Sequence, residues 1–431
     1  MTKKLGFLTA FSLFSLFAAP LWAATEPQAL GVDPAYQKAA AAETTFALEL
    51  YGQLKEDGGD IFFSPLSVAA VLDLLKAGAK GETLSQLALV LNRTGEPHNL
   101  SFAEFSQYLK DKATKIAEIP NEPQDQDQDK ADPAPKPTIT LALANSLWPQ
   151  EGLKIRPEYL KALGETPPLY PVDYQKNPED AINKINAWVQ TQTQDKIVNL
   201  LTTPLPPNST LVLINAVYFL GQWTHPFDLD KTSPREFNRP SGDKTPVPFL
   251  NQTRSWLYLE NDLGQIIKLP YGDESLSFLV LLPQNKPTGL ADLEKNLTRD
   301  NLVAWRAALT PKLVKLALPK FKIVWGTSSL KPALEKMGLT LAFETRADFS
   351  GLAEKAELFV GDILQKAFVG VDEKGTEAAA ATAAIMPRSA FLGEPINFVA
   401  DRPFIFLIQE EATGAILFLG RLTDPIVEAA K

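Results

Sequence analysis

The sequence of 431 residues contains no cysteine and only two histidines, His98 and His225. Without cysteine the chain can form no disulfide, thiolate nucleophile, zinc finger or iron–sulfur cluster. Two histidines so far apart leave little room for a histidine-rich metal site or a Ser–His–Asp triad. We therefore expect neither a metal ion nor a cofactor, and the commonest catalytic arrangements are excluded.

The chain also has fewer positively than negatively charged residues. It contains 42 Lys and Arg residues and 51 Asp and Glu residues, which gives a net charge of −9. Such a balance argues against nucleic acid or an anionic membrane as the main partner. Hydrophobic residues make up 45% of the chain and charged residues 22%, so the chain can bury a substantial core and is not globally disordered.

The N-terminus has the anatomy of a secretory signal peptide. Lys3 and Lys4 form a basic start, residues 5–19 are apolar, and small residues follow at a plausible cleavage site. The apolar run is shorter than the roughly 20 residues that span a membrane. We expect residues 1–23 to be removed and residues 24–431 to be secreted or periplasmic, with no membrane contact after cleavage.

Helical patterns dominate the first half of the chain and long strand patterns dominate the second half. This order predicts an α+β fold with a large, mostly antiparallel or mixed sheet rather than regular βαβ alternation. The helical patterns cover residues 65–79, 82–91, 102–116, 180–201, 290–309 and 329–337. The strand patterns cover residues 138–148, 210–223, 264–269, 276–282, 312–324, 358–372, 396–409 and 415–422.

One segment breaks this pattern. Residues 120–137 hold five prolines, five acidic residues and three glutamines but no aromatic residue. Such a composition cannot bury enough surface to order itself. We interpret it as a disordered surface insertion rather than an interdomain linker, and an acidic binding segment is the alternative.

A second unusual segment follows a strand pattern that ends at Val371. From Thr376 to Ala384 every side chain is small except Glu377. Alanine favours helix, but this stretch has no amphipathic stripe. Under strand alternation, the small residues would face inward and Glu377 outward, so the segment could enter an existing sheet. Residues 386–389 (MPRS) come next and resemble an exposed sequence that a protease could cut.

These residues resemble the reactive loop of the serpin family of protease inhibitors, since VDEKGTEAA at residues 371–379 is similar to the loop's hinge. Other family-like motifs follow in register, at residues 64–67, 215–223, 347–351, 398–406 and 418–425. The resemblance implies a serpin fold: helices packed on a large central mixed β-sheet, two further sheets, and an exposed reactive-centre loop over residues 374–394.

The resemblance also implies a mechanism. A target serine protease attacks the loop and forms an acyl-enzyme, and the cut loop then inserts into the central sheet and traps the protease. Residues 378–384 contain no proline or charge that would hinder insertion. The hinge residues are Glu373, Gly375, Thr376, Glu377, Ala378, Ala379, Ala380 and Ala381. The alternatives are a non-inhibitory serpin, such as a carrier or chaperone, and a serpin that inhibits cysteine proteases.

The scissile bond has two candidates. The usual family spacing, fourteen residues after Gly375, gives Ser389–Ala390, which would suit elastase-like or subtilisin-like proteases. Arg388 is the only basic residue between Lys374 and Arg402, and Arg388–Ser389 would suit trypsin-like proteases. We expect a monomer that needs no heparin-like polyanion.

Five further residues match family positions that hold the central sheet closed. Lys320 is expected to pair with Glu373 at the top of the sheet, with Trp223 packed beneath them. Ser67 and Asn215 match polar residues beneath the sheet centre. Gln365 stands where many family members have histidine, and an amide can both donate and accept hydrogen bonds without the pH sensitivity of histidine.

Overall fold

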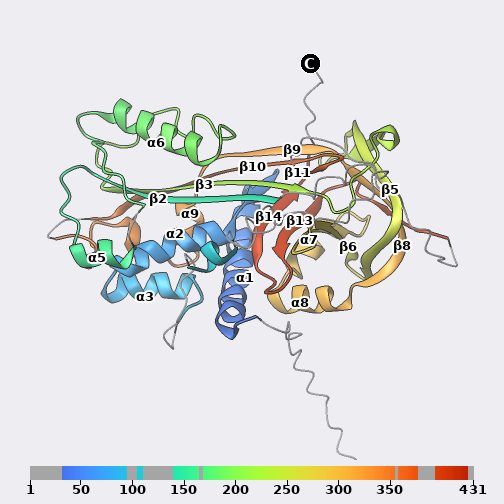
Figure 1. The fold of residues 1–431 in the computed structure, drawn as a ribbon, viewed down its shortest axis with the longest axis horizontal. Helices are drawn as coiled ribbons and strands as arrows, with labels where there is room; N and C mark the ends of the chain where they lie inside the picture. The colour runs from blue at the N-terminus through green and yellow to red at the C-terminus, as the bar shows by residue number, and fades with distance from the viewer. Residues whose placement is uncertain are drawn as a thin grey trace, which may run out of the picture.

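The structure, a computed structural model, describes residues 32–94, 104–109, 139–164, 168–354, 358–376 and 394–425. Figure 1 shows the arrangement of their helices and strands. Three sets of predictions lie outside the described residues. They are the signal peptide at residues 1–23, the insertion at residues 120–137, and the loop residues Glu377, Ala378, Ala379, Ala380, Ala381, Arg388, Ser389 and Ala390.

A mixed five-stranded sheet runs along the molecule in the order β2-β3-β11-β10-β9. Its strands are β2 (Ile139–Pro149), β3 (Leu211–Gln222), β9 (Phe321–Ser329), β10 (Val360–Val371) and β11 (Gly375–Thr376). β3 and β10 are parallel neighbours from Leu211↔Val360 to Tyr218↔Phe368, and the short β11 lies between their ends. β3 is buried almost throughout, as expected of a strand that is covered on both faces.

A second sheet of nine strands packs at one end of the first sheet. Its order is β1-β14-β13-β7-β6-β5-β8-β12, and β4 pairs with β5. The bounds are β1 (Ile61–Phe63), β4 (Ser233–Asn238), β5 (Lys244–Asn261), β6 (Gly264–Tyr271), β7 (Leu276–Pro283), β8 (Thr310–Pro319), β12 (Ile396–Val399), β13 (Phe404–Glu410) and β14 (Ile416–Leu422). The 18-residue β5 pairs with β4 and β8, then with β6 at its end, so the two further sheets that we expected are continuous through it.

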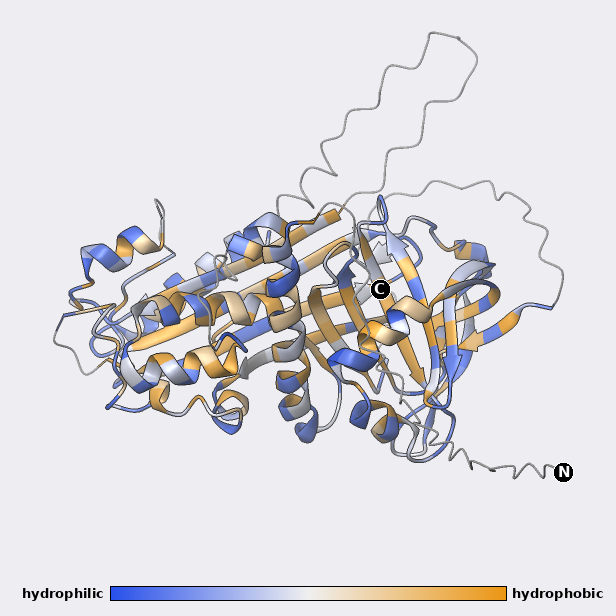
Figure 2. Cartoon of the chain, turned by 90° about the horizontal axis from the view of Figure 1, so that it is seen from below, coloured by the Kyte–Doolittle hydropathy of each residue, from blue (hydrophilic) through white to orange (hydrophobic). Residues whose placement is uncertain are grey.

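Helices cover both faces of the five-stranded sheet. In Figure 1, α6 lies on one face, and α1 and α2 lie on the other. Ser64 caps α2, because its Oγ accepts the Ser67 N–H at 3.3 Å, and Pro65 occupies the first turn of the helix. Figure 2 shows apolar strands enclosed by helices with hydrophilic outer sides. The bounds are α1 (Pro34–Leu54), α2 (Pro65–Gly78), α3 (Gly81–Val90), α5 (Pro157–Ala162), α6 (Pro178–Gln192), α7 (Gly289–Lys295), α8 (Arg299–Ala308) and α9 (Lys331–Lys336).

Several predicted elements were merged or too long. The strand predicted over residues 312–324 is two strands, since the chain leaves β8 at Pro319 and enters β9 of the other sheet. The helix predicted over residues 290–309 is two helices, because Thr298 caps a new one. α6 ends at Gln192 instead of Leu201. Helices α1 and α5 and strands β1, β4 and β5 were not predicted.

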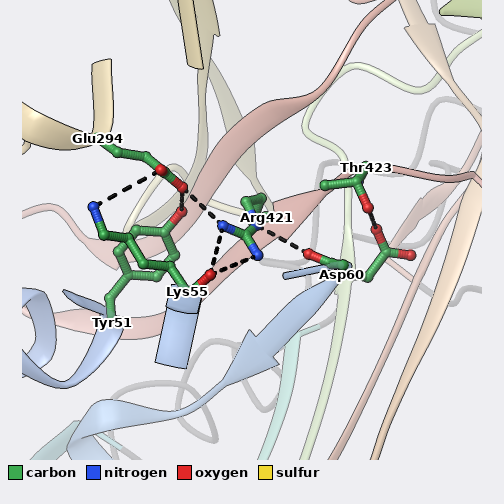
Figure 3. Close-up of polar contacts among 7 residues, drawn as sticks. Tyr51, Lys55, Asp60, Glu294, Arg421 and Thr423 are labelled. Carbon is green, nitrogen blue, oxygen red and sulfur yellow. Dashed lines mark hydrogen bonds and ion pairs between the residues drawn. The ribbon is translucent and has the colours of Figure 1, made fainter. Parts of the chain in front are cut away.

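A buried group of polar residues joins β14 to α1 (Figure 3). Arg421 on β14 forms an ion pair with Glu294 on α7 at 3.0 Å, and Tyr51 on α1 donates to the same Glu294 oxygen at 2.8 Å. Arg421 also donates to the backbone oxygens of Gly59 and Lys55. We call Tyr51, Glu294 and Arg421 the C-terminal clamp.

Candidate functional site

The turn between β10 and β11 places the first hinge residues inside the five-stranded sheet. The Asp372 carboxylate accepts the N–H groups of Lys374 and Gly375 at 2.8 and 3.2 Å, and the Asp372 N–H donates to the Gly375 oxygen. The chain thereby reverses direction, and Gly375 and Thr376 pair with the end of β3. A Cβ at Gly375 would lie 2.0 Å from a backbone oxygen of β3, so only glycine fits there.

Thr376 is fully buried and is held by a tyrosine from the other sheet. Its Oγ1 lies 2.5 Å from the hydroxyl of Tyr271, and burial raises the pKa of Tyr271 well above its usual value, so the hydroxyl keeps its proton. Tyr271 stacks on Trp223, with ring centroids 4.5 Å apart, and the Trp223 Nε1 donates to the Asp372 backbone oxygen at 2.9 Å. These contacts hold β11 in the sheet.

Glu373 adds an ion pair at the same turn. Its carboxylate accepts from the Lys320 Nζ at 2.7 and 3.0 Å and from the Thr232 Oγ1 at 2.8 Å. The Glu373 side chain is 9% exposed and that of Lys320 is 29% exposed. Burial alone would raise the pKa of Glu373, but the hydrogen bonds from Lys320 and Thr232 outweigh it and lower the pKa.

We call Trp223, Tyr271, Lys320, Glu373 and Thr376 the hinge cluster.

Four neutral side chains meet beneath the middle of the same sheet, and we call them the amide network. Gln365 on β10 donates to Asn215 on β3, and the Asn215 Nδ2 donates to the Ser67 Oγ at 2.6 Å. Asn145 on β2 accepts from both Asn215 and Ser67. Ser67, Asn215 and Gln365 are fully buried, so the network ties three strands to α2 without any charge.

The predicted sheet-control residues therefore fall into two groups. Trp223 and Lys320 meet Glu373 and Thr376 where β10 turns into β11, whereas Ser67, Asn215 and Gln365 meet beneath the sheet centre. Three contributors were not predicted, namely Asn145, Thr232 and Tyr271. Within the described ranges, no group of His, Asp and Glu residues could hold a metal ion, and no helix there is long and apolar enough to cross a membrane.

A family model described as serpin (serine protease inhibitor) matches residues 41–425. The chain belongs to the serpin family. This serpin is 35% identical over 394 residues to Iripin-8 of Ixodes ricinus, covering 89% of this chain and 93% of the relative. It is 34% identical to the leukocyte elastase inhibitor of Bos taurus, covering 90% and 100%. The crystal structure of human thyroxine-binding globulin matches with a TM-score of 0.75 at 28% identity, covering 91% and 99%.

The relatives confirm the predicted family and fold class, and they include a protein named as a protease inhibitor and one named for binding thyroxine. In this serpin, a strand that entered between β3 and β10 in the direction of β11 would be antiparallel to both. Its entry would replace one parallel pairing with two antiparallel ladders, each of which is somewhat more stable per residue. The sheet would therefore gain hydrogen bonds if such a strand entered it.

Proposed function

We propose that this serpin inhibits serine endopeptidases as a suicide substrate and is not itself an enzyme. The observation that carries the proposal is β11, where the hinge already pairs with both β3 and β10. The chain beyond Thr376 continues with small residues that fit a sheet interior. The kinship with a leukocyte elastase inhibitor supports the same activity.

The reaction uses the catalytic groups of the protease. Its serine Oγ attacks the carbonyl carbon that precedes the scissile bond, the C–N bond breaks, and the amine leaves with a proton from the protease's histidine. The resulting ester joins the protease to the end of the cut loop. Insertion of the loop as a new strand then carries the protease away and distorts its active site before water cleaves the ester.

The target class depends on which bond is cut. Cleavage at Arg388–Ser389 would serve trypsin-like proteases, and cleavage at Ser389–Ala390 would serve elastase-like or subtilisin-like ones. The experiment is to incubate the mature chain with one protease of each type and look for a covalent complex that survives SDS. Mass spectrometry of the C-terminal fragment, separated under denaturing conditions and starting at Ser389 or Ala390, identifies the bond. If every protease cuts the loop and none is trapped, the protein is a non-inhibitory serpin.

The hinge provides a matched pair of variants for the same assay. Thr376→Arg would have to bury a charge beside Tyr271, so insertion should fail and the protease should cut the loop without being trapped. Thr376→Ser keeps the hydroxyl and should form complexes like the unaltered chain. Equal complex formation by both variants would rule out insertion at this hinge.

We further propose that the protein is exported and acts as a monomer outside the cytoplasm. The basic start and apolar run of residues 1–23 support export. N-terminal sequencing of the protein after expression with its full N-terminus should find a chain that starts at residue 24. Retention of Met1 in the purified protein would contradict this proposal.

A further inference from the structure

A buried carboxyl group lies between α1 and the start of β14, outside the hinge cluster and the amide network. Glu43 on α1 is fully buried, and its Oε2 accepts the backbone N–H of Ile416 at 3.0 Å. Ile416 is the first residue of β14, which packs against α1 (Figure 1). β1 pairs with β14 only from Leu419 to Arg421, and the N–H of Ile416 bonds to the helix side chain instead. We call the contact between Glu43 and Ile416 the α1–β14 seam.

Glu43 lacks the partners that a buried carboxylate needs. Its Oε1 is buried with no hydrogen-bond partner among the described residues, so one backbone N–H is the only donor bound to the group there. Glu411 shows what an ionised carboxylate in the same fold requires, because three side chains donate to it, namely Lys268 at 2.6 Å, Ser277 and Gln409. Burial alone would raise the pKa of Glu411, but these donors outweigh it and lower the pKa. Glu43 has neither a cation nor a second donor.

The charged side chains around α1 are engaged elsewhere or exposed. Arg306 on α8 donates to the backbone oxygen of Gly414 at 3.1 Å, and Glu410, before β14, accepts from the Thr413 N–H at 2.7 Å. The ion pairs on the elements packed against α1 include Asp73–Lys76 on α2, Arg299–Asp300 on α8, Lys331–Glu335 on α9, and Lys55 and Arg421 with Glu294 at the C-terminal clamp. The exposed charges there include Lys38, Glu49, Glu56, Asp57 and Lys336.

None of these groups forms a hydrogen bond or ion pair with Glu43 in the described part of the chain. Burial raises the pKa of Glu43 well above 4.5, and the N–H of Ile416 opposes it only in part. Tyr51, also on α1, donates to Glu294, and burial raises its pKa as well, so its hydroxyl keeps its proton. Glu43 is therefore the titratable group at this contact.

We propose that the α1–β14 seam is a pH-sensitive contact, which holds the start of β14 while Glu43 is neutral and weakens when Glu43 ionises. In the neutral acid one oxygen still accepts from Ile416, and the loss is one unpaired O–H group. In the ionised form an uncompensated charge would stay buried, which is far more costly than an unpaired hydroxyl. Ionisation therefore favours a local opening that lets water reach the carboxylate. The C-terminal clamp at the other end of β14 differs, because Arg421 and Glu294 neutralise each other. The proposal does not depend on protease inhibition.

The direction of the pH effect follows from the proton that Glu43 carries. Because its pKa is raised in the folded chain, the folded state holds a proton that the unfolded state loses above about 4.5. The stability that this proton contributes is fully present below the unfolded pKa and is lost as pH rises through the folded pKa. Relative to a chain with a neutral side chain at this position, the unfolding equilibrium constant should rise about tenfold per pH unit until Glu43 ionises in the folded state.

Urea denaturation of the full chain and of Glu43→Gln at pH 5, 6, 7 and 8 tests the proposal. Glutamine keeps an oxygen that can accept from Ile416 but does not titrate. The ratio of the unfolding constant of the unaltered chain to that of Glu43→Gln should rise about tenfold from pH 5 to pH 6 and continue upward until it levels off. Groups that titrate equally in both chains cancel in this ratio. Glu49→Gln, the same substitution at an exposed position of α1, is the matched control and should give a constant ratio.

Hydrogen exchange of the unaltered chain locates the effect and decides the question if Glu43→Gln does not fold. After correction for the faster intrinsic exchange at high pH, the N–H of Ile416 should lose protection as pH rises from 5 to 8. The N–H of Leu419, buried in the same strand, should keep its protection. The proposal is overturned if the ratio of unfolding constants does not change with pH, if Glu49→Gln gives the same rise, or if Ile416 and Leu419 respond alike.

Discussion

The hinge cluster and the amide network hold the same two strands, β3 and β10, by different means. In the hinge cluster the strands are already separated by β11, and the contacts include an ion pair, stacked rings and a tyrosine–threonine hydrogen bond. In the amide network the strands pair directly, and every contact is between neutral groups. At one end of the sheet the two residues of β11 thus separate β3 from β10, whereas in the middle of the sheet the two strands pair directly.

This difference indicates a division of roles. The hinge cluster is partly exposed at Lys320 and carries charge, so salt and pH can act on it. The amide network is buried and neutral, so neither should affect it. A loop strand that enters at β11 meets the network next, and we infer that the network sets the main resistance to further opening. Substitutions in each cluster and a change of pH test this ranking, beginning with the largest expected effect.

Removal of the central amide should have the largest effect. Asn215→Ala takes away the side chain that bonds Gln365, Ser67 and Asn145, and leaves a small cavity. We expect the free energy of unfolding to fall by about 2–4 kcal/mol, measured from the midpoint of urea denaturation. Asn397→Ala, on an exposed position of β12, is the control and should change it by less than about 0.5 kcal/mol. Equal effects of the two variants would contradict the role given to the network.

Loss of the Tyr271 hydroxyl should have a smaller and more local effect. Tyr271→Phe leaves the buried Thr376 hydroxyl without its partner, which costs about 1–2 kcal/mol. That cost should favour a hinge outside the sheet, and hydrogen exchange of the peptide with residues 372–376 should become faster. Tyr170→Phe, at a half-exposed ring, should leave that exchange unchanged. Unchanged exchange in Tyr271→Phe would show that the hydroxyl does not hold β11.

Acidification should have the smallest effect and should act on the hinge cluster alone. Because the folded pKa of Glu373 is lowered, its ionised form stabilises the fold above the unfolded pKa of about 4.3, and this stabilisation disappears as pH falls through the lowered value. Glu373→Gln should therefore reduce stability by about 0.5 kcal/mol at pH 7, given the partial exposure of Lys320, and by progressively less as pH falls through the lowered pKa of Glu373.

Glu373→Gln has to be compared with the unaltered chain at each pH, because the pKa of Asp372 shifts in the direction opposite to that of Glu373. Burial raises the pKa of Asp372, so its ionised form destabilises the fold at neutral pH and the penalty falls as it is protonated. The part of this contribution that comes from burial is present in both chains and cancels in their difference, whereas the part that comes from the Glu373 charge is absent from Glu373→Gln. Gln365→Ala should lower stability equally at pH 7 and pH 3. A pH-dependent effect of Gln365→Ala would break the contrast between the two clusters.

The long strands could be predicted from sequence because their alternation is regular, as in β2, β3 and β10. β5 could not, since it contains two prolines and pairs with different strands along its length, which interrupts the alternation. α1 was missed because its alanine-rich sequence shows little contrast between its faces. Prolines within a strand, changes of pairing partner and weak amphipathicity therefore explain why these elements were not predicted.

Seven members of the two clusters were predicted through the family resemblance, but Tyr271 and Asn145 were not. Asn145 could have been identified from the sequence, because it is a polar residue in phase with the buried Leu143 and Leu147 of β2. Tyr271 could not have been identified in this way, because a tyrosine at the end of a strand is common. Its partner Thr376 is 105 residues away in the sequence and lies in another sheet. Contacts between sheets depend on how the sheets pack, and the local sequence pattern does not predict this packing.

The C-terminal clamp has a consequence for the protein after cleavage. The proposed cut lies between residues 388 and 390, so β12, β13 and β14 would then belong to a separate peptide. That peptide supplies two inner strands of the nine-stranded sheet, and the buried Arg421 fastens it to Glu294 and to the end of α1. The nicked molecule would remain one particle made of two chains, and its small chain would leave only when the core itself unfolds.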